Sequence, residues 1–147
     1  MLTRLRRLLT RRTREVDAAI GAADPPFVIY VMIPGDIQPL ERGERFEDPL
    51  EGLLKAASLG TITGGGSQMD DPYPDGRPRV EYCGIDIDAT DQDAARKLLR
   101  SALVKLGAPV GTELHFTTGD MPLLDRCDSG GWALNLKRDI RHPAFGV

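Results

Sequence analysis

The sequence predicts an α+β domain, because segments with strand and helix periodicity follow one another in a defined order between residues 27 and 117. The run FVIYVMI at 27–33 is apolar and rich in β-branched and aromatic residues, which is typical of a central strand. Residues 91–106 carry a broad apolar face at helical spacing, and residues 112–118 alternate. The complete order is strand, helix, strand, strand, helix, strand, which is the ferredoxin-like arrangement. We therefore expect a four-stranded antiparallel sheet with two helices on one face.

The first helix and the second strand are expected between the first strand and a loop. Asp48 followed by Pro49 indicates a helix start with the aspartate as N-cap, and Gly60 is expected to end that helix. The segment TITGGGSQM at 61–69 predicts a strand that is short, bulged or flat, because three consecutive glycines contribute no side-chain packing. Residues 70–78 hold an Asp-Gly pair and prolines on both sides of a tyrosine, which is typical of a loop.

The third strand, at 79–89, has apolar side chains on both sides. Before Gly84 the apolar side chains are at even positions, Val80 and Tyr82. After Gly84 they are at odd positions, Ile85 and Ile87. A β-bulge at Gly84 would bring both groups onto one face, and we favour it over a strand buried on both faces.

The second helix has clear signals at both ends. Thr90 or Asp91 is expected to cap its start, where the helix dipole favours a carboxylate. Gly107 is expected just past its end, with Pro109 beyond it.

The length of 147 residues fits one domain with two extensions. We assign 1–24 to a basic amphipathic helix, 25–119 to the ferredoxin-like domain, and 120–147 to a C-terminal extension that packs on the domain or on a partner. No apolar stretch reaches the roughly 20 residues of a membrane-spanning helix. The two cysteines lack metal-binding spacing, so reduced thiols and a cytoplasmic location are expected.

Charge is distributed unevenly along the chain. The net charge is −3, but residues 1–14 hold six basic and no acidic side chains, so residues 15–147 carry 13 basic against 22 acidic side chains, a net −9. The basic arm consists of Arg4, Arg6, Arg7, Arg11, Arg12 and Arg14.

Several roles are open for this arm. It could contact an anionic membrane surface, bind phosphates, act as a targeting presequence, or pack on the acidic body or on a partner. Nucleic acid is disfavoured, because the acidic body would repel phosphates.

The polar candidates for a site are Tyr82, Asp86, Asp88 and His115. The two aspartates are two residues apart on a strand, so their side chains point to the same side, and paired carboxylates can bind a divalent cation or exchange protons. A solvated strand end explains them as well. No metal site is predicted, because two scattered histidines and two scattered cysteines lack ligand spacing. No catalytic residue is assigned; a Cys83–His115 nucleophile pair is a minor alternative to a buried cysteine.

The tail after residue 119 contains the only tryptophan, Trp132, in an alternating stretch with Leu134 and Leu136. This stretch predicts an additional strand. Trp132 is a candidate partner-binding residue, with packing on its own domain as the equal alternative.

Three segments resemble a group of small bacterial α+β proteins of unassigned function. They are GTITGGGSQ at 60–68, VEYCGIDID at 80–88 and LVKLGAPVGTEL at 103–114, about a third of the chain. The resemblance implies a ferredoxin-like domain without an assigned activity, in the style of immunity proteins for secreted toxins.

The sequence thus favours a non-enzymatic binding protein that uses an acidic surface to bind a protein partner, as an immunity-like inhibitor would. The alternative is a small-molecule sensor or small enzyme with a cleft between sheet and helices. A homodimer through the sheet and membrane-surface contact through the N-terminal helix stay open as partner interactions. No cofactor is expected.

Overall fold

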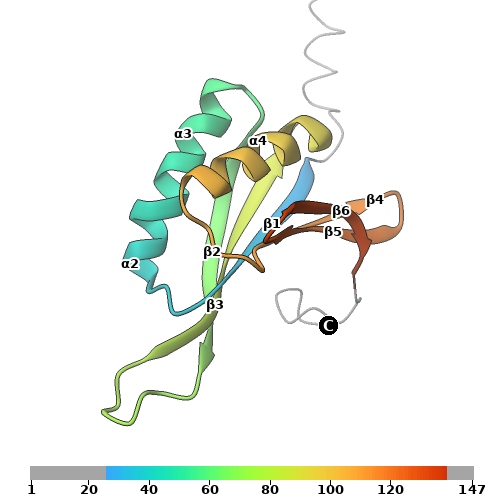
Figure 1. The fold of residues 1–147 in the computed structure, drawn as a ribbon. Helices are drawn as coiled ribbons and strands as arrows, with labels where there is room; N and C mark the ends of the chain where they lie inside the picture. The colour runs from blue at the N-terminus through green and yellow to red at the C-terminus, as the bar shows by residue number, and fades with distance from the viewer. Residues whose placement is uncertain (1–25, 139–147) are drawn as a thin grey trace, which may run out of the picture.

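The computed structural model describes residues 26–138, which form a six-stranded sheet with its helices on one face (Figure 1). The order across the sheet is β2-β3-β1-β4-β5-β6, and each neighbouring pair is antiparallel. The strands are β1 (Phe27–Pro34), β2 (Gly60–Asp70), β3 (Arg79–Ala89), β4 (Glu113–Thr118), β5 (Met121–Asp128) and β6 (Gly131–Lys137). The α+β class is confirmed. The expected number of four strands is wrong, because the tail adds β5 and β6 as a hairpin beside β4.

The first helical segment starts earlier than the sequence predicts. It comprises α2 (Pro39–Arg42), a wide π-helical turn η1 (Gly43–Glu47) and α3 (Asp48–Ala56). Asp48 has helical φ and ψ angles and its N–H bonds to the Gly43 carbonyl, so it is not an N-cap. Pro49 lacks an N–H and lies two residues after the end of the wide turn, which already interrupts the regular hydrogen-bond ladder. Gly60 does not end the helix either, since it is the first residue of β2.

The second helix and its caps follow the prediction. Helix α4 (Gln92–Lys105) is capped by Asp91, whose side chain accepts a hydrogen bond from the Ala94 N–H. Gly107 has a φ of 82°, the left-handed conformation of a residue just past a helix end.

The predicted bulge at Gly84 is wrong. Strand β3 has the predicted bounds, and its register with β1 runs without a shift from Tyr82 to Ala89. The pairing of β2 with β3 is shifted at two other places, where Thr63 is the extra residue in β2 and Glu81 is the extra residue in β3. Strand β3 therefore presents alternate side chains to two faces of the sheet, and both faces bury some of them.

One face of the sheet packs against the helices. The side chains of this helix-covered face share one parity on each strand and meet apolar side chains of α3 and α4 in a single core. The core residues from the strands are Ile29, Val31, Ile33, Cys83, Ile85, Ile87, Ala89, Leu114 and Phe116. None of the helices of the described residues lies on the opposite face, which we call the open face.

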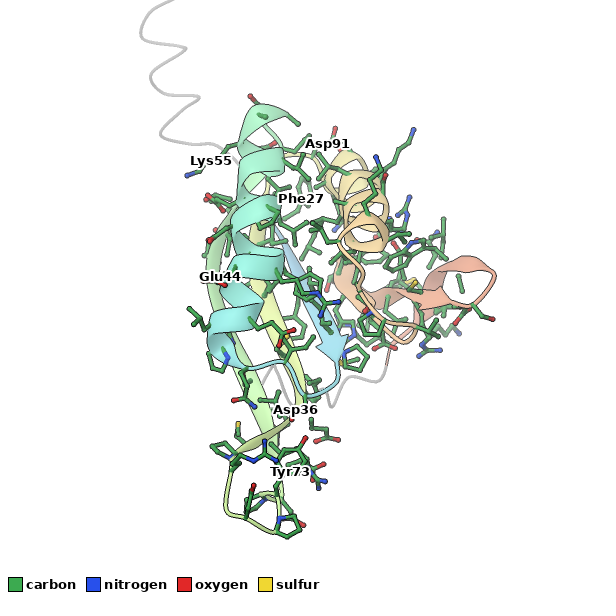
Figure 2. All side chains as sticks on the ribbon, turned by 60° about the vertical axis from the view of Figure 1, so that its left-hand side comes forward. Phe27, Asp36, Glu44, Lys55, Tyr73 and Asp91 are labelled. Carbon is green, nitrogen blue, oxygen red and sulfur yellow. The ribbon has the colours of Figure 1, made fainter. Side chains whose placement is uncertain are left out.

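The β2–β3 hairpin extends beyond the rest of the sheet (Figure 1). Its tip is tied to the segment after β1, because the Tyr73 hydroxyl donates a hydrogen bond to the Asp36 carboxylate (Figure 2). That carboxylate also accepts from the Val80 N–H at 2.8 Å. These bonds, the one from Tyr73 foremost, hold the pKa of Asp36 below its usual range.

Candidate functional site

Strand register decides which candidate side chains share the open face. Tyr30 of β1 is opposite both Asp86 of β3 and His115 of β4, so these three side chains point to the same side. Tyr82 and Asp88 have the parity of Asp86 and also belong to the open face.

Trp132 lies on the other side of the sheet. It is opposite Cys127 of β5, which has the same parity as Asp125 and therefore faces the helices. Trp132 also packs against the helix-covered core. Tyr82, Asp86, Asp88 and His115 thus share a face that excludes Trp132. The basic arm of Arg4, Arg6, Arg7, Arg11, Arg12 and Arg14 lies outside the described residues.

A pocket of about 220 Å³ opens on this face across β1, β2 and β3. Its lining combines two phenols, one carboxylate, polar side chains and bare glycine backbone. We call it the tyrosine–aspartate pocket, and it is lined by Tyr30, Gly65, Gly66, Ser67, Gln68, Tyr82 and Asp86.

At the glycines of β2 the pocket is lined by backbone alone. A Cβ at Gly66 would have no atom within 4 Å, so this position borders open space. A Cβ at Gly64 would lie 3.3 Å from Oδ2 of Asp86, which places the carboxylate over the β2 backbone. Gly64 and Gly66 therefore expose backbone beside Asp86, where a side chain would narrow the pocket.

Gly84 makes room for the ring of Tyr30. A Cβ at Gly84 would overlap the Tyr30 ring and its hydroxyl, so any side chain there would displace the tyrosine. Tyr30 is 8% exposed, and burial, followed by the charges of Tyr82 and Asp86, raises the pKa of its phenol. The phenol is therefore protonated at neutral pH and presents a neutral aromatic group to the pocket.

The carboxylates of the open face have few internal cations. Within residues 26–138, neither Asp86 nor Asp88 has a cationic nitrogen within 4 Å. The nearby Arg42 lies on the other side of β2, where it bonds Glu47 at 2.7 Å and the Ser67 hydroxyl at 3.1 Å. The charge of Arg42 is therefore matched by Glu47 and not by Asp86.

Asp88 and His115 lie in separate hollows from Asp86. Asp88 borders a shallow hollow of about 400 Å³ beside Lys55 and Thr61. His115 borders another of about 360 Å³ beside Thr117. The structure thus divides the predicted set, and only Tyr82 and Asp86 share the tyrosine–aspartate pocket.

His115 contacts a carboxylate on its own strand, β4. Its Nε2 lies 2.9 Å from the Glu113 carboxylate, which also accepts from Arg126 at 2.8 Å. Burial opposes ionisation of Glu113, but the hydrogen bonds from His115 and Arg126 outweigh it and keep its pKa below the usual range. His115 also packs on Tyr30, with the ring centroids 5.7 Å apart. These contacts make His115 part of the packing on the open face.

The arrangement of Cys83 does not support nucleophilic catalysis. Cys83 belongs to the helix-covered face, whereas His115 belongs to the open face, so the sheet separates them. Burial raises the pKa of the Cys83 thiol to about 11, so it is protonated at neutral pH. Within residues 26–138, no three histidine, cysteine, aspartate or glutamate side chains converge as metal ligands would.

Sequence reasoning missed Tyr30, which lines the pocket, and the role of Gly84, which makes room for the Tyr30 ring. Tyr30 is inside an apolar run, and its position opposite Asp86 follows from strand register alone. Gly84 did stand out where the apolar parity changed, but its function is to accommodate a ring from a neighbouring strand.

No helix within residues 26–138 is long and apolar enough to cross a membrane. Comparisons with protein-family models, with curated proteins and with solved structures find no match to this chain.

Proposed function

We propose that this protein is a non-enzymatic binding protein whose open sheet face binds a basic protein partner, in the manner of an immunity-like inhibitor. The observation that carries the proposal is the tyrosine–aspartate pocket, where Asp86 has no cationic partner among the described residues. A carboxylate beside aromatic side chains on an accessible sheet suits a cationic protein surface.

The acidic body strengthens this proposal. Residues 26–138 hold 18 acidic and 12 basic side chains, and several of the basic ones are already paired internally. Such a surface accelerates encounter with a basic partner and makes the association rate sensitive to salt. The free thiols of Cys83 and Cys127 support the cytoplasmic location that is part of the proposal.

The proposal includes a ferredoxin-like origin of the fold. Strands β1 to β4 occur in the order β2-β3-β1-β4, with a helix after β1 and another after β3. This order supports a ferredoxin-like unit to which the β5–β6 hairpin was added as an extension of the sheet. The open face of that unit would then be the binding surface.

Charge removal on the open face tests the proposal. The double variant Asp86→Asn/Asp88→Asn and the control Asp71→Asn/Asp93→Asn change the net charge equally, and the control residues are exposed and outside the open face. Immobilised full-length proteins would be incubated with lysate of the source cells at low and high salt, and the captured proteins identified by mass spectrometry.

We expect a basic protein that wild type and control capture at low salt and that the open-face variant loses. Equal capture by all three proteins would contradict binding through this face. Thermal melts of the variants would verify that both are folded.

The second candidate is a small-molecule sensor, which the volume of the pocket favours. A thermal-shift screen of metabolites against wild type and Gly66→Val would distinguish it, because valine fills the pocket without removing a charge. A stabilising metabolite whose effect disappears in Gly66→Val would favour the sensor over the protein-binding function.

A further inference from the structure

The helix-covered face contains an arginine site built from an aspartate and an aromatic ring. Arg96 of α4 donates to both carboxylate oxygens of Asp125, from Nε at 3.0 Å and from Nη2 at 2.7 Å. Its guanidinium also stacks 3.7 Å above the centroid of the Phe116 ring. This combination of a two-oxygen contact and an aromatic platform is the geometry that a guanidinium prefers.

The tyrosine–aspartate pocket contains the same two kinds of group on the open face. Asp86 provides the carboxylate, and Tyr30 and Tyr82 provide aromatic rings beside it. The chain itself provides no cation there among the described residues, in contrast to Arg96 and Arg100 at Asp125.

We propose that the tyrosine–aspartate pocket is a receptor for a single arginine side chain of the basic partner. This inference rests on the proposed function and adds the group that the open face recognises. The guanidinium would bind the Asp86 carboxylate and lie against the tyrosines, while its stem would pass over Gly66.

Arginine fits the pocket better than lysine does. A planar guanidinium can bind both carboxylate oxygens and stack on an aromatic ring at once, whereas an ammonium is a more strongly hydrated point charge. The volume of about 220 Å³ is suited to one side chain rather than to a folded segment of the partner. The bare backbone at Gly66 leaves an entrance from the β2 edge of the sheet.

The test uses the full chain and two small probes that are nearly equal in shape and differ in charge. N-acetyl-arginine amide is titrated into isotope-labelled protein and binding is followed by amide chemical shifts. The matched probe is N-acetyl-citrulline amide, which replaces the guanidinium by a neutral urea group of nearly the same shape. Wild type, Asp86→Asn, Gly66→Val and the control Asp71→Asn are compared.

We expect saturable shifts around Gly66 and Asp86 with the arginine probe, and at least tenfold weaker binding of the citrulline probe. Asp86→Asn should weaken arginine binding at least tenfold, and Gly66→Val should abolish it by filling the pocket. Asp71→Asn should leave it unchanged.

Equal binding of the two probes, or equal arginine binding by wild type and Asp86→Asn, would overturn the inference. Its failure is distinguishable from failure of the proposed function. Loss of a captured basic protein in Asp86→Asn/Asp88→Asn without arginine selectivity would leave the proposed function standing and remove the arginine pocket. Because Gly66→Val blocks the pocket without touching a charge, it separates pocket binding from general attraction to an acidic surface.

Discussion

Asp125 and Asp86 are carboxylates on opposite faces of one sheet, and they differ in how their charge is matched. Asp125 is fully buried and is bonded by Arg96, Arg100 and the Asn135 N–H. Asp86 is half-buried beside two tyrosines and has no cationic partner among the described residues.

The difference separates a structural charge from a binding charge. The Asp125 cluster joins α4 to the β5–β6 hairpin, so its value is internal to the fold. The Asp86 carboxylate has no hydrogen bond or ion pair within residues 26–138. Its removal should therefore change the free energy of unfolding little and weaken partner binding strongly.

Removing the buried carboxylate should have the largest effect on stability. Asp125→Ala leaves Arg96, whose side chain is 8% exposed, and Arg100 without their buried counter-charge. Breaking a buried pair in this way costs about 3–5 kcal/mol in free energy of unfolding, measured by urea denaturation.

The control for this prediction uses the same arginine. Asp93 contacts Arg96 at 3.3 Å with a side chain that is 90% exposed, so Asp93→Ala should change stability by less than about 0.5 kcal/mol. Equal losses in the two variants would contradict the assignment of the buried cluster as structural.

The second prediction concerns the packing of Tyr30 on Gly84. Gly84→Ala forces the Tyr30 ring out of its place, which should cost about 1–3 kcal/mol and reshape the pocket. Gly66→Ala is the control, because its Cβ meets no atom within 4 Å. A Gly84→Ala protein as stable as the control, by thermal melting, would show that the ring adapts freely.

The limits of prediction from this sequence are clearest at Gly84. Strand β3 was predicted with its correct bounds because its turn signals and apolar residues are local. The reason for buried residues of both parities is not local, since a ring from β1 packs over Gly84. From the residue pattern of β3 alone, a bulge was the simplest explanation for apolar residues of both parities.

The candidate site was predictable in part for the same reason. The alternation of β3 predicts Asp86 and Asp88 on one side, and this is what the structure has. The bulge predicted at Gly84 would have turned Tyr82 to the opposite side, whereas the unshifted register leaves it on the side of the aspartates. The contribution of Tyr30 and the separation of His115 depend on the order and register of β1 and β4, which no local pattern encodes. The position of Trp132 on the helix-covered face depends likewise on the pairing of β6 with β5.

The smallest expected effect concerns the free edge of β2. The Glu51 carboxylate accepts from the Ile62 N–H at 2.6 Å and from the Thr61 hydroxyl at 2.9 Å, which blocks part of this edge. These bonds, the one from Ile62 foremost and with help from Lys55, lower the pKa of Glu51. Because the folded pKa is depressed, this stabilisation is present above the usual glutamate pKa and is lost as pH falls through the folded value.

Glu51→Gln should therefore destabilise the protein by about 0.5–1.5 kcal/mol at pH 7 and reduce the loss of stability on acidification. The control is Glu44→Gln on the same helical run, where the side chain is exposed (Figure 2). Denaturation curves at pH 7 and pH 3 measure both effects, and parallel pH dependence of Glu51→Gln and wild type would refute the role of this carboxylate.

The central claim is that Asp86 is a binding charge that recognises a guanidinium. The most direct measurement is a double cycle that combines Asp86→Asn with replacement of the arginine probe by its citrulline analogue. If the carboxylate and the guanidinium contact each other, the two changes are not additive, and the coupling should be at least tenfold in Kd, about 1.4 kcal/mol. Additive effects with no coupling would contradict the claim.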